Sequence, residues 1–145
     1  MSAIRRFEDI DAWQLGRELT RRVYEATRGS SFARDFGLRD QIQRASVPIT
    51  SNIAEGFERR SPQDFARILL IARGSAGEVR SQLYAPLDLG SIEQDTFDDL
   101  YALATRISRA TVALARHNRA HADTTREPYD PYLVPRTEYP TTAPS

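Results

Sequence analysis

Residues 37–83 read GLRDQIQRASVPITSNIAEGFERRSPQDFARILLIARGSAGEVRSQL, and this stretch decides the fold of the chain. Apolar side chains recur in it at steps of three and four residues, which is the spacing of one face of an α-helix. Ser61-Pro62 interrupts the pattern once with a helix start signal. The stretch therefore predicts two long helices joined by a short turn.

The first of these helices is expected from about Asp35 to Phe57. Its apolar stripe, of a kind suited to a helical bundle, comprises Leu38, Ile42, Ala45, Ile49, Ile53 and Phe57. Pro48 lies inside the stripe, where a proline removes one backbone donor and clashes with the preceding turn. Because the periodicity continues on both sides of Pro48, we expect a kink near residues 44–48 rather than a break.

The second helix has a clear start, with Ser61 as N-cap, Pro62 at the first helical position and Asp64 at the third. Its apolar stripe has the heptad rhythm of antiparallel bundle helices and comprises Phe65, Leu69, Ala72, Ala76, Val79 and Leu83. Pro86 is expected to bend or end this helix, and Gly90 to end any continuation.

Gly74 and Gly77 lie in the middle of this second helix. An interior glycine costs up to about 1 kcal/mol of helix stability relative to alanine. We therefore expect another backbone to approach closely there, from the preceding helix or from a neighbouring subunit.

The flanking segments predict two more helices, over residues 9–28 and from Glu93 or Asp95 to Asn118. In the first of them, Trp13 is expected to be buried against the bundle, and oppositely charged residues at i,i+4 spacing predict a solvated outer face. The fourth helix has acidic residues near its start and Arg116 near its end, which suits the helix dipole.

These four helices predict one domain, an all-α, antiparallel up-down-up-down four-helix bundle over residues 1–118. Five of the eight prolines fall in residues 128–144, among threonine, tyrosine and aspartate. Residues 119–145 are therefore expected to form a Pro/Tyr-rich tail without a core of its own.

Composition excludes several kinds of chemistry. Cysteine and lysine are both missing, so thiolate nucleophiles, cysteine metal sites and lysine bases are excluded. The two histidines, His117 and His121, have no Glu-x-x-His motif beside them, so we expect no metal, no cofactor, no catalytic residues and no small-molecule substrate. No apolar run is long enough for a signal peptide or a membrane span, so we expect a cytoplasmic protein.

Polar residues occupy helical positions inside the decisive stretch. Gln41, Arg44, Asn52 and Glu55 on its first helix, with Ser75 and Glu78 on its second, are expected to form a structural network between the two helices. Glu55 is also within reach of Arg59 at i,i+4 spacing. The alternative interpretation is a pocket for a ligand or RNA.

All 20 basic residues are arginines, and the formal net charge is zero. Arg59 and Arg60 in the turn, with Arg67 after it, are a candidate phosphate-binding cluster, and Arg106, Arg109 and Arg116 form a stripe on the fourth helix. The alternative is that these arginines are solvated and balanced by nearby acids, as a neutral chain does not predict a uniformly basic surface.

Three short runs carry a resemblance to a known family. The runs Gln41-Ile42-Gln43-Arg44-Ala45, Ser51-Asn52-Ile53-Ala54-Glu55-Gly56-Phe57 and Gly74-Ser75-Ala76-Gly77-Glu78 resemble the 23S rRNA intervening-sequence proteins. These are bacterial four-helix bundle proteins related to the accessory variability proteins of diversity-generating retroelements. The resemblance covers about residues 7–118, although the family often places the proline two residues later than Pro48.

The resemblance implies a homopentamer without enzymatic activity. Some family members are encoded within insertions of ribosomal RNA genes, and the retroelement relatives bind a reverse transcriptase and nucleic acid. We therefore expect a non-enzymatic oligomeric scaffold or adaptor that binds RNA or a nucleic-acid enzyme such as a reverse transcriptase. The alternative is a purely structural, self-assembling bundle whose partner is another protein.

Overall fold

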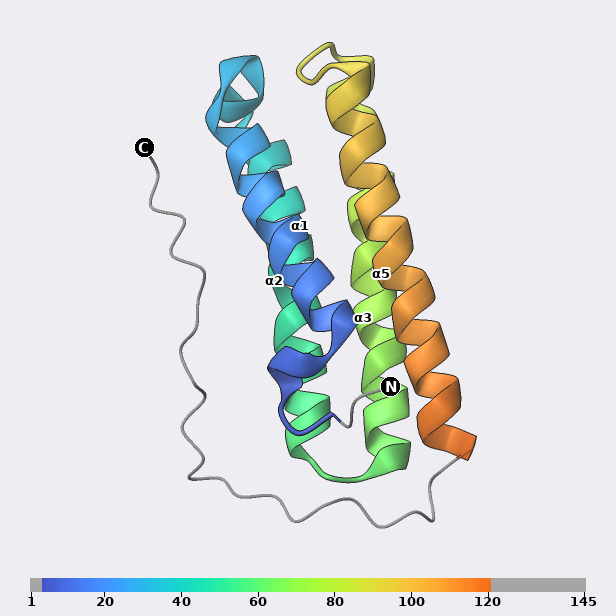
Figure 1. Ribbon diagram of the computed structural model, residues 1–145. Helices are drawn as coiled ribbons and strands as arrows, with labels where there is room; N and C mark the ends of the chain where they lie inside the picture. The colour runs from blue at the N-terminus through green and yellow to red at the C-terminus, as the bar shows by residue number, and fades with distance from the viewer. Residues whose placement is uncertain (1–3, 121–145) are drawn as a thin grey trace.

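The computed structural model describes residues 4–120, and its four long helices pack side by side in an antiparallel bundle (Figure 1). These helices are α1 (Asp11–Arg28), α2 (Phe36–Glu58), α3 (Pro62–Gln82) and α5 (Gln94–Ala120). Three short elements join or flank them: η1 (Phe7–Asp9), η2 (Ser30–Arg34) and α4 (Tyr84–Asp88). The predicted fold class is confirmed, and residues 121–145 of the expected tail lie outside the described residues.

Each long helix contacts two neighbours, so that α1, α2, α3 and α5 follow one another around the bundle and α5 returns to α1. The turn between α2 and α3 has the predicted chemistry. The Ser61 hydroxyl accepts a hydrogen bond from the Asp64 N–H at 3.3 Å, and Pro62 occupies the first helical position. The next turn, after α4, includes Gly90 at φ 71°, a left-handed conformation that favours glycine.

α2 runs as one helix through Pro48, and the alternative of two separate pieces is not what the structure shows. Ile42 and Ala45 before the proline and Ile49 and Ile53 after it are all buried. The continuous apolar face holds the helix against the bundle although proline removes one backbone donor.

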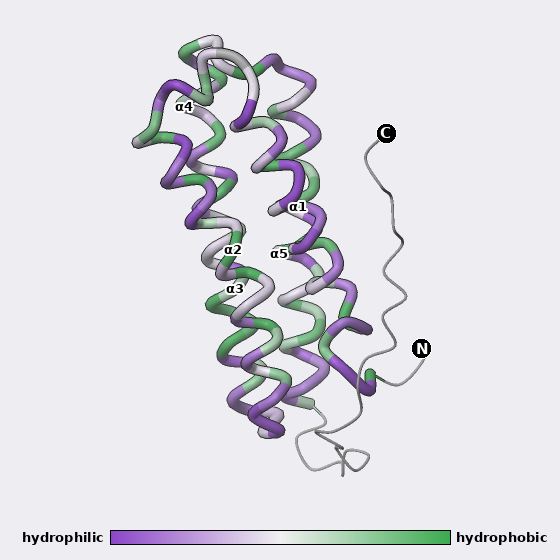
Figure 2. The backbone as a smooth tube through the Cα atoms, turned by 90° about the vertical axis from the view of Figure 1, so that its left-hand side faces the viewer, coloured by the Kyte–Doolittle hydropathy of each residue, from purple (hydrophilic) through white to green (hydrophobic). Residues whose placement is uncertain are grey.

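Apolar side chains from all four long helices meet along the bundle axis. Hydrophobic and hydrophilic residues alternate along each of these helices (Figure 2), which is the pattern of a helix with one buried face. Fully buried residues include Leu19, Ile49, Leu69, Leu83 and Ile107. No helix in the described range is long and apolar enough to cross a membrane.

Trp13 lies at the rim of this core and is only half-buried, which corrects the expectation of a buried tryptophan. Ala12 occupies the inward position on α1 and is 1% exposed. Trp13 follows it, so its side chain is turned by about 100° around the helix axis, away from the centre of the core. Phe7 of η1 packs on the Trp13 ring at a centroid distance of 5.3 Å, and the guanidinium of Arg17 lies 6.0 Å from it.

Two glycines mark the closest approaches between helices. A Cβ added to Gly16 on α1 would lie 2.9 Å from Ile49 Cγ2 on α2. A Cβ added to Gly56 on α2 would lie 3.0 Å from Phe65 Cδ2 and 3.1 Å from Ile68 on α3. A Cβ at Gly16 would force a neighbouring atom to shift, and one at Gly56 would be tighter than nearly all real Cβ contacts, so both positions favour glycine.

Gly74 and Gly77 do not make the close contact with α2 that the sequence analysis expected. A Cβ at Gly74 would have no atom within 4 Å, and one at Gly77 would meet only the tip of Arg80 at 3.6 Å. Ile68 faces α2, and Gly74 follows it by six residues, which is about 240° around the helix. The glycine pair therefore lies on the outer side of α3, where no other helix of the described residues approaches it closely.

Candidate functional site

A groove of about 410 Å³ runs between α3 and α5. It is lined by Arg73 and Arg80 from α3 and by Thr105, Ser108, Arg109, Val112, Ala113 and Arg116 from α5. We call it the arginine groove, because four of its eight lining residues are arginines and none is acidic. Such a lining favours an anionic ligand.

The heptad repeat of the two helices explains why these arginines share a groove. Arg73 and Arg80 are seven residues apart, as are Arg109 and Arg116. Seven residues are two helical turns, so each pair lies on one edge of its helix with about 10.5 Å between its Cα atoms. Because α3 and α5 are neighbouring antiparallel helices, the two edges face the same groove.

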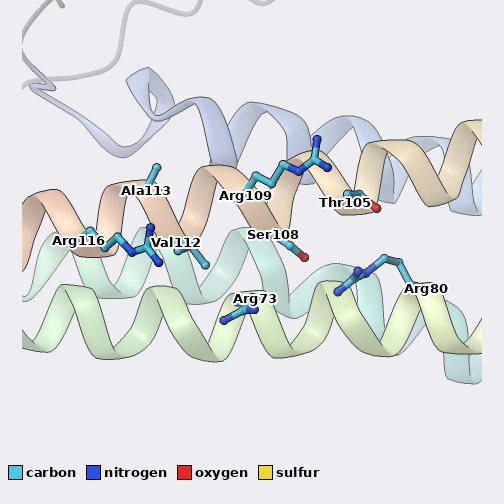
Figure 3. A pocket seen from close by; sticks show the side chains of 8 residues that line it. All are labelled: Arg73, Arg80, Thr105, Ser108, Arg109, Val112, Ala113 and Arg116. Atoms are coloured by element: carbon cyan, nitrogen blue, oxygen red, sulfur yellow. The ribbon is translucent and has the colours of Figure 1, made fainter.

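The order of the arginines along the groove is visible in the close-up (Figure 3). Arg116 lies at one end, Arg73 and Arg109 lie near the middle, and Arg80 lies at the other end. Arg80 and Arg116 extend into the space between α3 and α5, Arg73 lies along α3, and the guanidinium of Arg109 turns away from α3. With two intervals of about 10.5 Å placed end to end, the Cα atoms of the four arginines span about 20 Å along the groove.

No carboxylate of residues 4–120 forms a salt bridge with this row of charges. In the described part of the chain, the salt bridges join Arg6–Asp9, Arg21–Glu25, Arg22–Glu18, Arg39–Asp40 and Arg59–Glu55, and none includes a groove arginine. The Nε atom of Arg80 is buried and has no hydrogen-bond partner. Leaving a buried donor unsatisfied costs about 1–3 kcal/mol, and more when the donor is charged.

An aromatic cluster continues the arginine groove at its Arg80 end. Tyr84 follows Arg80 by one helical turn, because backbone hydrogen bonds run across Leu83 from α3 into α4. The Tyr84 ring lies 5.0 Å from Phe97 and 6.1 Å from Tyr101, and the guanidinium of Arg80 lies 5.9 Å from the Tyr101 ring. The site therefore combines cations with aromatic rings.

The pKa of Tyr84 is raised by its neighbours. The electrostatic effect of Tyr101, together with its hydrogen bond, is the main reason that the pKa of Tyr84 lies above its usual value, and Asp88 adds to it. A phenol with the ordinary pKa of about 10 is already neutral at physiological pH, and the upward shift of the Tyr84 pKa adds to that margin. The ring therefore offers an uncharged aromatic face beside the arginine groove.

The arginines that the sequence analysis selected do not lie together at one site in the structure. Arg109 lines the arginine groove, whereas Arg106 on the same helix and Arg67 on α3 are exposed outside it. Arg59 pairs with Glu55 at 2.7 Å, and the guanidinium of Arg60 lies 5.4 Å from the ring of Phe57.

Arg73 and Arg80 were not selected from the sequence. The signal that could have found them is the matched seven-residue spacing of arginines on the two helices.

The polar residues of the predicted network do not join α2 to α3. Gln41, Arg44, Glu55 and Glu78 are exposed, and Asn52 and Ser75 are half-buried. Glu55 bonds to Arg59 within α2, as expected, but the hydrogen bonds of the described residues include none between these six side chains. The residues follow the outer edges of α2 and α3 because the apolar stripes, not the polar ones, take the space between the helices.

A second hollow of about 470 Å³ lies between α1 and α2, beside Tyr24, Asp40 and Arg44. The Gln43 side chain crosses this region and donates to the Thr27 hydroxyl at 2.8 Å. Asp40 lines the hollow with Arg44, so the lining has no excess of one charge.

In the described range, no three His, Asp or Glu side chains are grouped to hold a metal ion, and His121 lies outside that range.

Comparison with known proteins agrees with this architecture. A crystal structure of a protein of unknown function from the S23 ribosomal protein family of Bacteroides thetaiotaomicron matches with a TM-score of 0.65 at 21% sequence identity. The match covers 72% of this chain and 98% of that chain, and at this identity it is evidence for the fold alone. No curated protein matches.

A family model described as 23S rRNA-intervening sequence protein matches residues 8–113, which is most of the chain. This range includes all three runs that carry the resemblance in the sequence. The chain therefore belongs to the 23S rRNA-intervening sequence protein family.

Proposed function

We propose that the protein is a non-enzymatic scaffold of the cytoplasm that binds RNA through the arginine groove and acts as a homo-oligomer. The observation that carries the RNA-binding proposal is the line of four arginines without an acidic neighbour. Arginine presents a planar fork of donors that matches phosphate oxygens, and a row of such forks suits a phosphate backbone better than an isolated anion.

The zero net charge of the chain makes the location of the positive charge important. A neutral protein lacks a long-range field that would hold RNA anywhere on its surface. The arginine groove supplies a local excess of four positive charges. Binding should therefore depend on this groove and respond strongly to salt.

The first prediction concerns the salt dependence of RNA binding. Four arginine–phosphate contacts predict that the logarithm of the binding constant falls with the logarithm of salt concentration with a slope of about −3 for a single strand. Raising salt from about 50 to about 200 mM should then weaken binding about fiftyfold. Fluorescence anisotropy with a labelled RNA measures this slope.

The same preparation distinguishes the two functions expected from the sequence. A raised 260/280 absorbance ratio after purification at low salt, together with the steep slope, supports an RNA scaffold. A clean preparation that does not bind RNA at low salt contradicts it and favours the alternative, a purely structural, self-assembling bundle whose partner is another protein.

The outer side of α3 is the candidate contact surface between subunits of the proposed oligomer. Ile71 is 47% exposed there, and a side chain at Gly74, three residues on, would have empty space around it. An exposed isoleucine beside a glycine gives a neighbouring subunit both apolar area and room to approach. We propose that this side of α3 forms the contact between subunits.

The second prediction concerns the mass of the assembly. Light scattering after size exclusion should give about five times the 16.4 kDa mass of the chain if the family's pentamer is formed. Ile71→Arg should lower that mass to that of the single chain, since it puts a charge into the contact. Leu89→Arg is the matched control, because Leu89 is exposed at the end of the bundle. A wild-type monomer, or equal effects of both variants, would contradict the proposal.

A further inference from the structure

We infer that the arginine groove takes an unpaired nucleic-acid strand and that Tyr84 stacks on one of its bases. This inference rests on the proposed function and narrows it, since RNA binding alone does not distinguish a single strand from a duplex. It is carried by the position of the aromatic cluster at one end of a row of unpaired arginines.

The shape of the groove favours one strand. It lies between two neighbouring helices, whose axes in packed bundles are about 8–10 Å apart. A duplex carries its two backbones on a surface much wider than this space. A single backbone can follow the line of arginines, and about 20 Å of groove corresponds to about six stacked nucleotides.

Tyr84 is the member of the aromatic cluster that a base can reach. Its side chain is 49% exposed, whereas Phe97 is 8% exposed. Tyr101 is stacked on Phe97 at 5.4 Å, and Arg80 also lies near its ring, so less of it is free. Phe97 and Tyr101 hold the Tyr84 ring from the side of the bundle, which leaves its solvent side for stacking. Single-strand binding proteins combine cationic grooves with aromatic side chains in this way.

Acidic residues beyond Tyr84 would prevent the phosphates of the strand from binding past this end of the arginine groove. Asp88 is close enough to Tyr84 to influence its ionisation. Asp95 lies in the first turn of α5 and Asp98 in the next, on the helix that carries Phe97. These carboxylates repel a phosphate but not an uncharged base. The last group bound at this end is therefore a base, and the phosphates remain between Arg116 and Arg80.

The test compares ligands and Tyr84 variants in the full-length protein. The probes are a labelled single-stranded RNA of about ten nucleotides, the same RNA annealed to its complement, and a polyphosphate chain without bases. Wild type should bind the single strand at least about tenfold more tightly than the duplex. Tyr84→Leu should weaken single-strand binding about five- to hundredfold, the range of base–aromatic stacking, while Tyr84→Phe keeps it. Polyphosphate binding should be the same in all three proteins.

The outcomes separate the inference from the proposed function. If RNA and polyphosphate both fail to bind, the proposed function is wrong. If both bind but the duplex competes equally, or Tyr84→Leu binds the single strand as wild type does, the function stands and this inference is overturned. A polyglutamate peptide that binds as tightly as the RNA would also overturn it, because the site would then select charge alone. Thermal melting of each variant checks that α4 remains folded.

Discussion

Gly56→Leu is expected to lower the free energy of unfolding by about 2 kcal/mol or more. The first added atom would lie 3.0 Å from Phe65 and 3.1 Å from Ile68, in the contact between α2 and α3. Forcing extra atoms into a packed core typically costs about 1–3 kcal/mol, and leucine adds three further carbons to the Cβ. The better helix propensity of leucine returns at most about 1 kcal/mol.

Gly74→Leu is the matched control for that variant. It makes the same chemical change in the middle of a long helix, but the space around the added Cβ is open. Measured in the Ile71→Arg background, which removes the proposed contact between subunits on this side of α3, stability should rise by up to about 1 kcal/mol, because only the helix propensity then changes. Urea unfolding at one fixed protein concentration measures both variants, since self-association would otherwise shift the midpoints. Equal losses in the two variants would show that the helices do not pack as described.

Much of the fold could be predicted from sequence because its signals are local. Helix periodicity depends on residues that are three or four apart in the sequence, and the Ser61-Pro62 start signal lies within a single turn. The observed helices begin and end within two residues of the expected limits, apart from the end of the third helix. There the sequence analysis expected Pro86 to bend or end the helix, and in the structure α3 ends at Gln82, before the short α4.

The contacts between helices could not be predicted in the same way. Nothing in the sequence distinguishes the glycines inside the long helices, which include Gly16, Gly56, Gly74 and Gly77. In the structure, a Cβ at Gly16 or Gly56 would meet another helix, whereas one at Gly74 or Gly77 would not. The difference depends on the rotation of each helix about its axis and on the register between neighbours. A pattern of polar residues likewise does not show whether a stripe faces a neighbour or solvent, which is why the expected network was wrong.

The arginine groove is an intermediate case. Arg109 was found from its own helix, but its partners Arg73 and Arg80 are separated from it by about thirty residues of chain. Their common spacing of seven residues becomes informative once α3 and α5 are known to be neighbours. The turn arginines, Arg59 and Arg60, are adjacent in sequence, but one is held by Glu55 and the other lies over Phe57.

Arg73→Glu/Arg116→Glu is expected to weaken RNA binding more than about a hundredfold. Each change removes a charge-assisted hydrogen bond to phosphate, worth about 1.5–3 kcal/mol, and adds a repelling carboxylate. Both arginines line the groove, and each supplies one of its four positive charges (Figure 3). Both arginines are exposed, so the variant should fold as the wild type does, and its melting temperature verifies that.

The most direct measurement is the dissociation constant for single-stranded RNA of this variant beside that of Arg67→Glu/Arg106→Glu. The two proteins have the same net charge, but Arg67 and Arg106 lie outside the arginine groove. We predict that binding is nearly lost in the groove variant and changes less than about threefold in the control. Equal losses in the two, or a larger loss in the control, would contradict the assignment of RNA binding to the groove between α3 and α5.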